Sequence, residues 1–317
     1  MPQHSSNDDL IYVLSPSSAL PEAQQLDRAE ECLTQLGFSV QRDPDVLAQH
    51  TRFAGTDAQR LAAIERSTEG EHGIVLASRG GYGLSRLLPS IDWQRIADSG
   101  KRYVGHSDFT AFNLALLAQT GQISYAGPSA VFDFGAEVVD ELTADLFAET
   151  MRGELEILSF ESFNSDPVDG RGILWGGNLA MVCSLLGTPY FPAINQGILF
   201  LEDVGEHPYR IERMLAQLLQ AGVLERQLAI VLGNFSDYRL QPHDQGYTLD
   251  SVIEWLRSQC RVPIITGLPY GHTEIKATLP VGKKVGIAWE DDMAYLLLDE
   301  HEHSHTHEHS EPCSHDH

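Results

Sequence analysis

Three residues that could perform nucleophilic catalysis lie at or shortly after predicted strands. Ser107 lies in VGHSD, Glu202 in ILFLED and His272 in GLPYGH. A serine nucleophile needs a base to take its proton, and the base needs a carboxylate to hold it, so this set could hydrolyse an acyl bond. Taken singly, each residue has a common structural explanation. Ser107 could be a helix N-cap, Glu202 a capping or surface charge, and His272 a structural histidine. The chemistry therefore depends on whether the fold brings the three side chains together.

The segment SRGGYG at 78–83 is the second candidate for chemistry, and it also follows a predicted strand. Glycines at this density allow backbone N–H groups to converge on an anion, and the guanidinium of Arg79 suits a carboxylate. The segment is not a P-loop, because no Lys-Ser or Lys-Thr pair follows, and it lacks G-x-G-x-x-G spacing. A tight turn explains one or two of the glycines but not the arginine. We expect Arg79 and Gly80 to contact substrate.

Three acids near the end of one predicted strand could orient the histidine. Glu202 directly follows the apolar run and should leave the sheet at its carboxyl edge, where sites of α/β proteins form. Asp203 is its neighbour, and in an extended strand it would point to the opposite face. Glu206 precedes a predicted helix, where capping and the helix dipole explain an acid. Glu202 is therefore the physical choice.

The elements that must position these residues alternate between short strands and helices, which is typical of a parallel sheet covered by helices. We predict an α/β protein with an N-terminal open parallel-sheet domain of flavodoxin or Rossmann type. A smaller C-terminal α/β domain with a β-rich end should follow it. The predicted strands are 10–14, 38–41, 73–77, 103–105, 197–201, 228–232 and 262–266, and the predicted helices are 22–36, 57–66, 109–118, 208–219 and 249–257.

The predicted domain boundaries follow changes in composition. Residues 1–150 form the N-terminal domain that carries the nucleophile, and 173–299 form the C-terminal domain with the glutamate and the histidine. Between them, 151–172 is rich in Ser, Asn, Asp, Pro and Gly and is interpreted as a linker. Residues 300–317 form a His-rich tail that cannot build a core, so we expect it to be disordered.

The tail could bind Ni²⁺ or Zn²⁺ through imidazole nitrogens. The interpretation that we favour is a solvated extension with incidental metal affinity, because nothing in its composition would order it. Its candidate metal ligands are His301, His303, His305, His307 and His309.

Composition excludes several classes of partner. The chain has 45 acidic and 21 basic residues and a formal net charge of -24, without a basic cluster, so we predict no nucleic-acid partner. No apolar run approaches the roughly 20 residues of a membrane span, so we predict no membrane partner. Residues 1–9 lack the features of a signal peptide, and the four cysteines lack C-x-x-C spacing. A cytoplasmic location is therefore expected.

Short motifs spread over most of the chain resemble the muramoyltetrapeptide (LD-) carboxypeptidases in order and spacing. The motifs are FAGT at 53–56, RGGYG at 79–83, GHSDFT at 105–110, LWGGNL at 174–179, LED at 201–203, EHP at 206–208, GLP at 267–269 and GH at 271–272. The resemblance implies a serine peptidase in which Ser107 is the nucleophile, His272 the general base and Glu202 the carboxylate. It also implies an oxyanion hole formed by the backbone N–H groups of Gly81 and Asp108.

The resemblance further implies the substrate and the setting. The family's substrate is the murein tetrapeptide, a peptidoglycan-derived peptide, whose terminal D-alanine is joined to the L-centre of meso-diaminopimelate. Its setting is cytoplasmic peptidoglycan recycling, and its members are two-domain homodimers with the site between the domains. No metal in the catalytic site and no cofactor are expected. Arg79 is the candidate for binding the terminal carboxylate of the peptide.

Two alternatives stay open. The microcin-immunity branch of the family cleaves an aminoacyl-nucleotide antibiotic with the same triad, but its members carry extra loop sequence. Only a short stretch separates Asp203 from Pro208 here, which leaves little room for such a loop. The other alternative is a non-catalytic metal or ligand carrier on a flavodoxin-like fold. The presence of all three triad residues disfavours a carrier.

Overall fold

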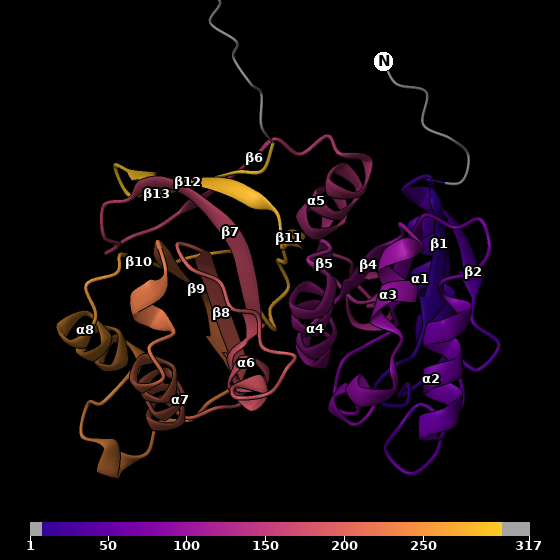
Figure 1. Cartoon of the computed structure of the whole chain (residues 1–317), viewed down its shortest axis with the longest axis horizontal. Coiled ribbons are helices and arrows are strands. Elements are labelled where there is room, and N and C mark those ends of the chain that lie inside the picture. Colours follow the sequence, from indigo (N-terminus) through magenta and orange to yellow (C-terminus); the bar gives the residue numbers. More distant parts are fainter. Residues whose placement is uncertain (1–7, 300–317) are drawn as a thin grey trace, which may run out of the picture.

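Two β-sheets form the framework of the protein. The computed structural model describes residues 8–299, and Figure 1 shows the two sheets side by side with helix α4 between them. The first sheet has six strands in the order β11-β5-β4-β3-β1-β2, and the second has seven in the order β10-β9-β8-β7-β12-β13-β6. The strands are β1 (Leu10–Leu14), β2 (Ser39–Arg42), β3 (Ile74–Ala77), β4 (Arg102–Gly105), β5 (Ser124–Ala126), β6 (Ile157–Glu161), β7 (Asp169–Asn178), β8 (Ile198–Val204), β9 (Ala229–Ser236), β10 (Ile264–Ile265), β11 (Leu279–Val281), β12 (Lys284–Glu290) and β13 (Met293–Leu297). The helices are α1 (Ala23–Gln35), α2 (Asp57–Arg66), α3 (Trp93–Asp98), α4 (Thr110–Thr120), α5 (Glu141–Arg152), α6 (Leu179–Leu185), α7 (Pro208–Gln220) and α8 (Leu249–Gln259).

The first sheet is buried on both faces. In β1, Ile11 and Val13 pack in one core with residues of α1 and α5, whereas Tyr12 and Leu14 pack in the core on the opposite face. Successive side chains of a strand point to opposite faces, and apolar residues on both faces are typical of a parallel strand covered by helices. Strands β1 to β5 run parallel, and only β11 is antiparallel to its neighbour.

Helix α4 connects the two halves of the molecule. All eight of its residues from Thr110 to Leu117 are buried, and it contacts β5 of the first sheet and β7 of the second. A helix that is apolar all round has no face for solvent and therefore lies inside a protein. Because α4 begins directly after the turn that contains Ser107, the packing of both sheets fixes the position of that turn.

The second sheet combines a parallel and an antiparallel part. Strands β7, β8, β9 and β10 run parallel, and β12, β13 and β6 extend the sheet in antiparallel fashion beyond β7. Helices α6, α7 and α8 lie on one side of the parallel part in Figure 1. In α7 the apolar stripe Ile211, Leu215 and Leu218 is buried. The carboxyl ends of β7 and β8 meet at one edge of this sheet, as Asn178 pairs with Glu202 in the register.

The chain crosses between the halves at two places, of which the sequence indicated only the first, at 151–172. Residues 151–172, expected as a linker, contain β6 and the beginning of β7, both in the second sheet. In β6, buried Leu158 and Phe160 alternate with exposed residues. A strand with one face in solvent contains few apolar residues, and such a composition is also typical of a linker. Strand β11 comes from the C-terminal half but pairs with β5 of the first sheet.

The α/β fold class is confirmed. Each predicted strand and helix is present, although the strand expected at 262–266 is shortened to β10. Within residues 8–299, none of the helices combines the length and the apolar character that crossing a membrane requires.

Candidate active site

Ser107 lies in the sharp turn between β4 and α4. Strand β4 ends at Gly105, and one 3-10 turn over Ser107–Phe109 precedes the helix. Ser107 has a φ of 61°, a left-handed conformation that costs a non-glycine residue on the order of 1–3 kcal/mol. Such a conformation persists only where the surrounding structure holds it, and it is concentrated at functional sites.

The glycine-rich loop after β3 packs directly on this turn. A Cβ atom on Gly80 would lie 2.7 Å from the Cβ of Ser107, so this approach requires glycine. The buried carboxylate of Asp108 joins the two segments, because its Oδ2 accepts hydrogen bonds from the Ser17 hydroxyl (2.7 Å) and the Leu84 N–H (3.0 Å). Burial raises the pKa of Asp108, and these hydrogen bonds partly oppose the rise.

Two backbone N–H groups lie where the loop meets the turn. Gly81 has a φ of 108°, which favours glycine, and a Cβ on the adjacent Gly80 would lie 3.2 Å from the backbone nitrogen of Asp108. In the part of the chain that the structure describes, no turn, loop or cap hydrogen bond uses the N–H of Gly81 or Asp108. Both donors are therefore available to an oxygen of a bound molecule.

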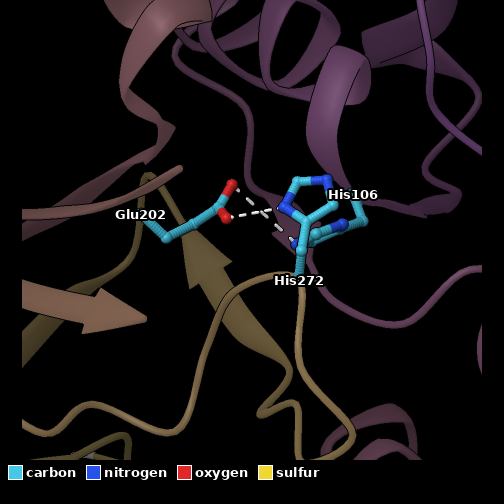
Figure 2. Close-up of side chains that lie close together, drawn as sticks. All are labelled: His106, Glu202 and His272. Atoms are coloured by element: carbon cyan, nitrogen blue, oxygen red, sulfur yellow. Dashed lines mark hydrogen bonds and ion pairs between the residues drawn. The ribbon is translucent and has the colours of Figure 1, made fainter. Parts of the chain in front are cut away.

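Glu202 holds one nitrogen of His272. The distance between His272 Nδ1 and Glu202 Oε2 is 2.8 Å, the Glu202 side chain is fully buried, and the His272 side chain keeps 24% of its surface exposed. Figure 2 shows the carboxylate directed at His272 and at a second histidine, His106. With Nδ1–H donating to the carboxylate, Nε2 is the ring nitrogen that can accept a proton.

Asn178 supports the carboxylate from the end of β7. Its Nδ2 lies 3.2 Å from Glu202 Oε1 and 3.0 Å from Asp203 Oδ1. A register irregularity between Leu201 and Asp203 breaks the strict alternation expected for adjacent strand residues, so both carboxylates reach the same amide. Asp203 is otherwise occupied, because its Oδ2 accepts the Ala180 N–H at 2.9 Å near the start of α6. Burial raises the pKa of Asp203.

Glu206 lies beyond the end of β8 and pairs with a different residue. Its Oε2 is 3.5 Å from Arg210 Nη1, one turn along α7, and its side chain is 27% exposed. Of the three acids that the sequence offered as candidates to orient His272, Glu202 is the one hydrogen-bonded to it.

His106 packs against His272 beside the same carboxylate. The two ring centroids are 4.4 Å apart, and His106 Nε2 lies 4.0 Å from Glu202 Oε1. His106 is 5% exposed, and its Nε2 is buried without a hydrogen-bond partner. Burial, with smaller contributions from Lys276 and His272, holds the pKa of His106 well below its ordinary value. Its imidazole is therefore neutral near pH 7.

One cavity of about 1150 Å³ is lined by predicted site residues from both halves of the chain, although Glu202 and Asp108 are not among its lining residues. Ser107 and Gly81 line it from the first half, and His272 lines it from the second. Within the described chain, no hydrogen bond joins Ser107 to His272. Such bonds are often long in free enzymes and shorten when substrate binds. The cavity is large enough for a peptide, since pockets that bury drug-sized ligands measure about 300–1,000 Å³.

Charged side chains of both signs line this cavity. Arg79 is held by the Ala19 carbonyl at 3.0 Å and lies over the ring of Phe132, and burial lowers its pKa. Lys276 and Asp133 form a buried ion pair with Nζ and Oδ1 2.5 Å apart. The remaining acidic lining residues are Asp140, Glu141 and Glu274. A ligand that carries both ammonium and carboxylate groups fits such a lining.

The comparison with known protein families matches both halves of the chain. Residues 11–127 match the LD-carboxypeptidase N-terminal domain, and residues 171–287 match the LD-carboxypeptidase C-terminal domain. The chain belongs to the LD-carboxypeptidase family. It is a serine-type carboxypeptidase, as the sequence motifs predicted.

Relatives of this LD-carboxypeptidase span nearly its whole length. The probable murein peptide carboxypeptidase of Bacillus subtilis is 32% identical, over 90% of this chain and 91% of the relative. The crystal structure of muramoyltetrapeptide carboxypeptidase from Oxalobacter formigenes is 41% identical with a TM-score of 0.86, covering 90% of this chain and 97% of that one. The microcin C7 self-immunity protein shares the fold with a TM-score of 0.83. It is 23% identical, and the match covers 92% of this chain and 96% of that one.

Two residues beside Glu202 and His272 of this LD-carboxypeptidase had no predicted role. Asn178 and His106 both belong to motifs that the sequence presents, LWGGNL and GHSDFT. The available signal was position, because each is a polar residue at the end of an apolar strand. The tail histidines His301, His303, His305, His307 and His309 lie outside the described residues.

Proposed function

We propose that this protein is an LD-carboxypeptidase that releases the terminal D-alanine from murein tetrapeptide. The bond broken would join the L-centre of meso-diaminopimelate to D-alanine. The observation that carries the proposal is the Glu202–His272 hydrogen bond at the wall of a cavity that Ser107 also lines. The names of the Bacillus and Oxalobacter relatives support the substrate class.

In the proposed mechanism, Ser107 Oγ attacks the carbonyl carbon while His272 Nε2 takes its proton. Glu202 holds Nδ1–H and stabilises the imidazolium that forms. The N–H groups of Gly81 and Asp108 stabilise the oxyanion. His272 then gives the proton to the leaving amine of D-alanine, and water hydrolyses the acyl-enzyme with the same residues.

The substrate would be recognised by charge. The terminal carboxylate of D-alanine is assigned to Arg79, with Gly80 leaving space beside Ser107. The free ammonium and carboxylate of the D-centre of diaminopimelate match a lining that carries both signs. This assignment needs no cofactor and no metal in the catalytic site.

The setting is also part of the proposal. We place the enzyme in cytoplasmic peptidoglycan recycling, as a homodimer without nucleic-acid or membrane partners. Light scattering of the purified protein tests the dimer, and a monomer mass would contradict it.

The deciding experiment is incubation of the protein with murein tetrapeptide and mass-spectrometric detection of free D-alanine. The Ser107→Ala variant should lose at least about 10³-fold in turnover, because the nucleophile is gone. Ser184→Ala, an exposed serine on α6, is the matched control and should keep wild-type turnover. Full activity of Ser107→Ala would exclude the serine mechanism.

The microcin-immunity activity is the second candidate. Solved structures of that immunity protein include a complex with aspartyl sulfamoyl adenosine. Here β8 ends at Val204 and α7 begins at Pro208, so the connection between them is too short to add a nucleotide-binding loop. Release of aspartate from that compound in preference to D-alanine from tetrapeptide would favour the second candidate.

A further inference from the structure

His106 gives this site a third potential metal ligand. One ligand atom each from His106, Glu202 and His272 lie within 4.8 Å of one another. Figure 2 shows the two imidazole rings on the same side of the carboxylate. Two histidines and one carboxylate are a ligand set that Zn²⁺ accepts in proteins, with a fourth position left for water.

The state of His106 Nε2 points to a ligand role. Buried polar atoms normally have a hydrogen-bond partner, and an exception calls for an explanation. His106 Nε2 has none, although it is buried and lies 4.0 Å from Glu202 Oε1. A cation between these atoms would give the orphan nitrogen its partner.

The distances are close to those of a tetrahedral site. Zinc bonds to nitrogen and oxygen measure about 2.0–2.2 Å, so ligand atoms around one ion stand about 3.4 Å apart. His272 Nδ1 lies 2.8 Å from Glu202 Oε2, and His106 Nε2 lies 4.0 Å from the other carboxylate oxygen, Oε1, so the two distances lie on either side of that value. Small side-chain rotations would equalise them. Asn178 would hold the ligating carboxylate, as outer-shell partners do.

We propose that His106, Glu202 and His272 form an inhibitory Zn²⁺ site that switches the serine hydrolase off. A metal on His272 Nδ1 requires that nitrogen to give up its proton, and the neutral ring then carries its proton on Nε2. No net proton is released, because one ring nitrogen loses what the other gains. A protonated Nε2 cannot accept the proton of Ser107, and Glu202 no longer holds the imidazole. The inhibition rests on the proposed function, whereas the metal site does not.

The kinetic test measures D-alanine release from murein tetrapeptide by the full chain at free Zn²⁺ concentrations fixed by a chelator buffer. The chelator buffer holds the free Zn²⁺ concentration constant even if the tail histidines bind some of the metal. Wild-type turnover should fall as Zn²⁺ rises and return on addition of EDTA. Each variant is compared with its own zinc-free rate.

His106→Phe should raise the Zn²⁺ concentration for half-inhibition at least about tenfold, since loss of even an outer-shell partner costs 10–100-fold in metal affinity. His72→Phe replaces another buried histidine that does not line the cavity, and it should keep wild-type zinc sensitivity. Equal inhibition of wild type and His106→Phe, or stimulation by zinc, would overturn the proposal.

A second measurement does not depend on activity. Crystals of the wild-type protein soaked in ZnCl₂ should give an anomalous-difference peak at the zinc edge within about 2.0–2.2 Å of the three ligand atoms. A map without a peak there would overturn the site, even if the protein hydrolyses tetrapeptide. A peak there in a protein that releases no D-alanine would leave the site standing and refute the proposed function.

Discussion

Glu202 holds His272 from inside the protein, with its Oε2 2.8 Å from Nδ1, while the imidazole keeps 24% of its side-chain surface exposed. The two ring nitrogens therefore have different surroundings. Nδ1 faces a buried carboxylate, whereas the ring borders the cavity. In the proposed mechanism the carboxylate fixes the tautomer, and the other nitrogen is left for proton transfer.

Replacing Glu202 by Gln should lower kcat by roughly 10²- to 10⁴-fold, because a neutral amide neither fixes the tautomer nor stabilises the imidazolium. Steady-state kinetics with murein tetrapeptide measure the effect, and circular dichroism checks the fold. Glu206→Gln, which removes an acid paired with Arg210, should stay near wild-type kcat. The opposite ranking of the two variants would transfer the orienting role to Glu206.

Gly80→Ala should lower kcat at least about tenfold while the protein remains folded. The added Cβ would lie 2.7 Å from the Cβ of Ser107 and must displace the nucleophile turn, and displacements of about 1 Å cost up to 10²-fold. Gly187→Ala is the control, because its Cβ would meet open space at a φ of 81°. That variant should lose stability but not turnover. Wild-type kcat in Gly80→Ala would show that the close contact is unimportant.

Asn178→Ala should destabilise the protein by about 1–3 kcal/mol, since both buried carboxylates lose a donor. The free energy of unfolding in urea measures this. The loss in kcat should be smaller than in Glu202→Gln, because the bond between Glu202 and His272 remains. A larger kcat loss in Asn178→Ala than in Glu202→Gln would assign Asn178 a direct part in the chemistry.

The pH dependence of stability should change in His72→Phe. Burial lowers the pKa of His72 below 6.5, and the folded ring donates from Nε2 to the Ser67 carbonyl while its buried Nδ1 has no partner. As pH falls below the unfolded pKa of about 6.5, the unfolded chain takes up a proton that the folded chain resists, so stability is lost.

The variant lacks this proton uptake, so its free energy of unfolding should fall less between about pH 7.5 and about pH 5.5 than that of the wild type. His106, whose pKa is also lowered, leaves part of the slope in place. Urea unfolding at the two pH values measures the difference. A variant with an unchanged or steeper slope would contradict the assignment.

Truncation after Asp299 should leave turnover and thermal stability unchanged. Leu298 is buried and its N–H donates to the Glu156 carbonyl, so the truncated chain retains the last backbone hydrogen bond of residues 8–299. Retention on a nickel column should be lost with the tail histidines. A truncated protein with a lower melting temperature would show that residues 300–317 contribute to the fold.

The sequence by itself determined the residue types at the strand ends and the order of the seven strands and five helices that it predicted. Periodicity, glycines and caps depend on near neighbours in the chain, and they predicted helix α2 at its observed bounds, Asp57–Arg66. Ser107, Glu202 and His272 could be named for the same reason, since each lies in a short motif at or after a strand.

Only the tertiary structure decided which of these side chains meet. The bond between Glu202 and His272 spans 70 residues of sequence, and the closeness of Gly80 to Ser107 depends on two strands packing side by side. The irregularity in β8 that brings Asp203 to Asn178, and the contact of His106 with His272, have no local signature. The physical reason is that such contacts arise from packing between distant segments, which a local pattern does not encode.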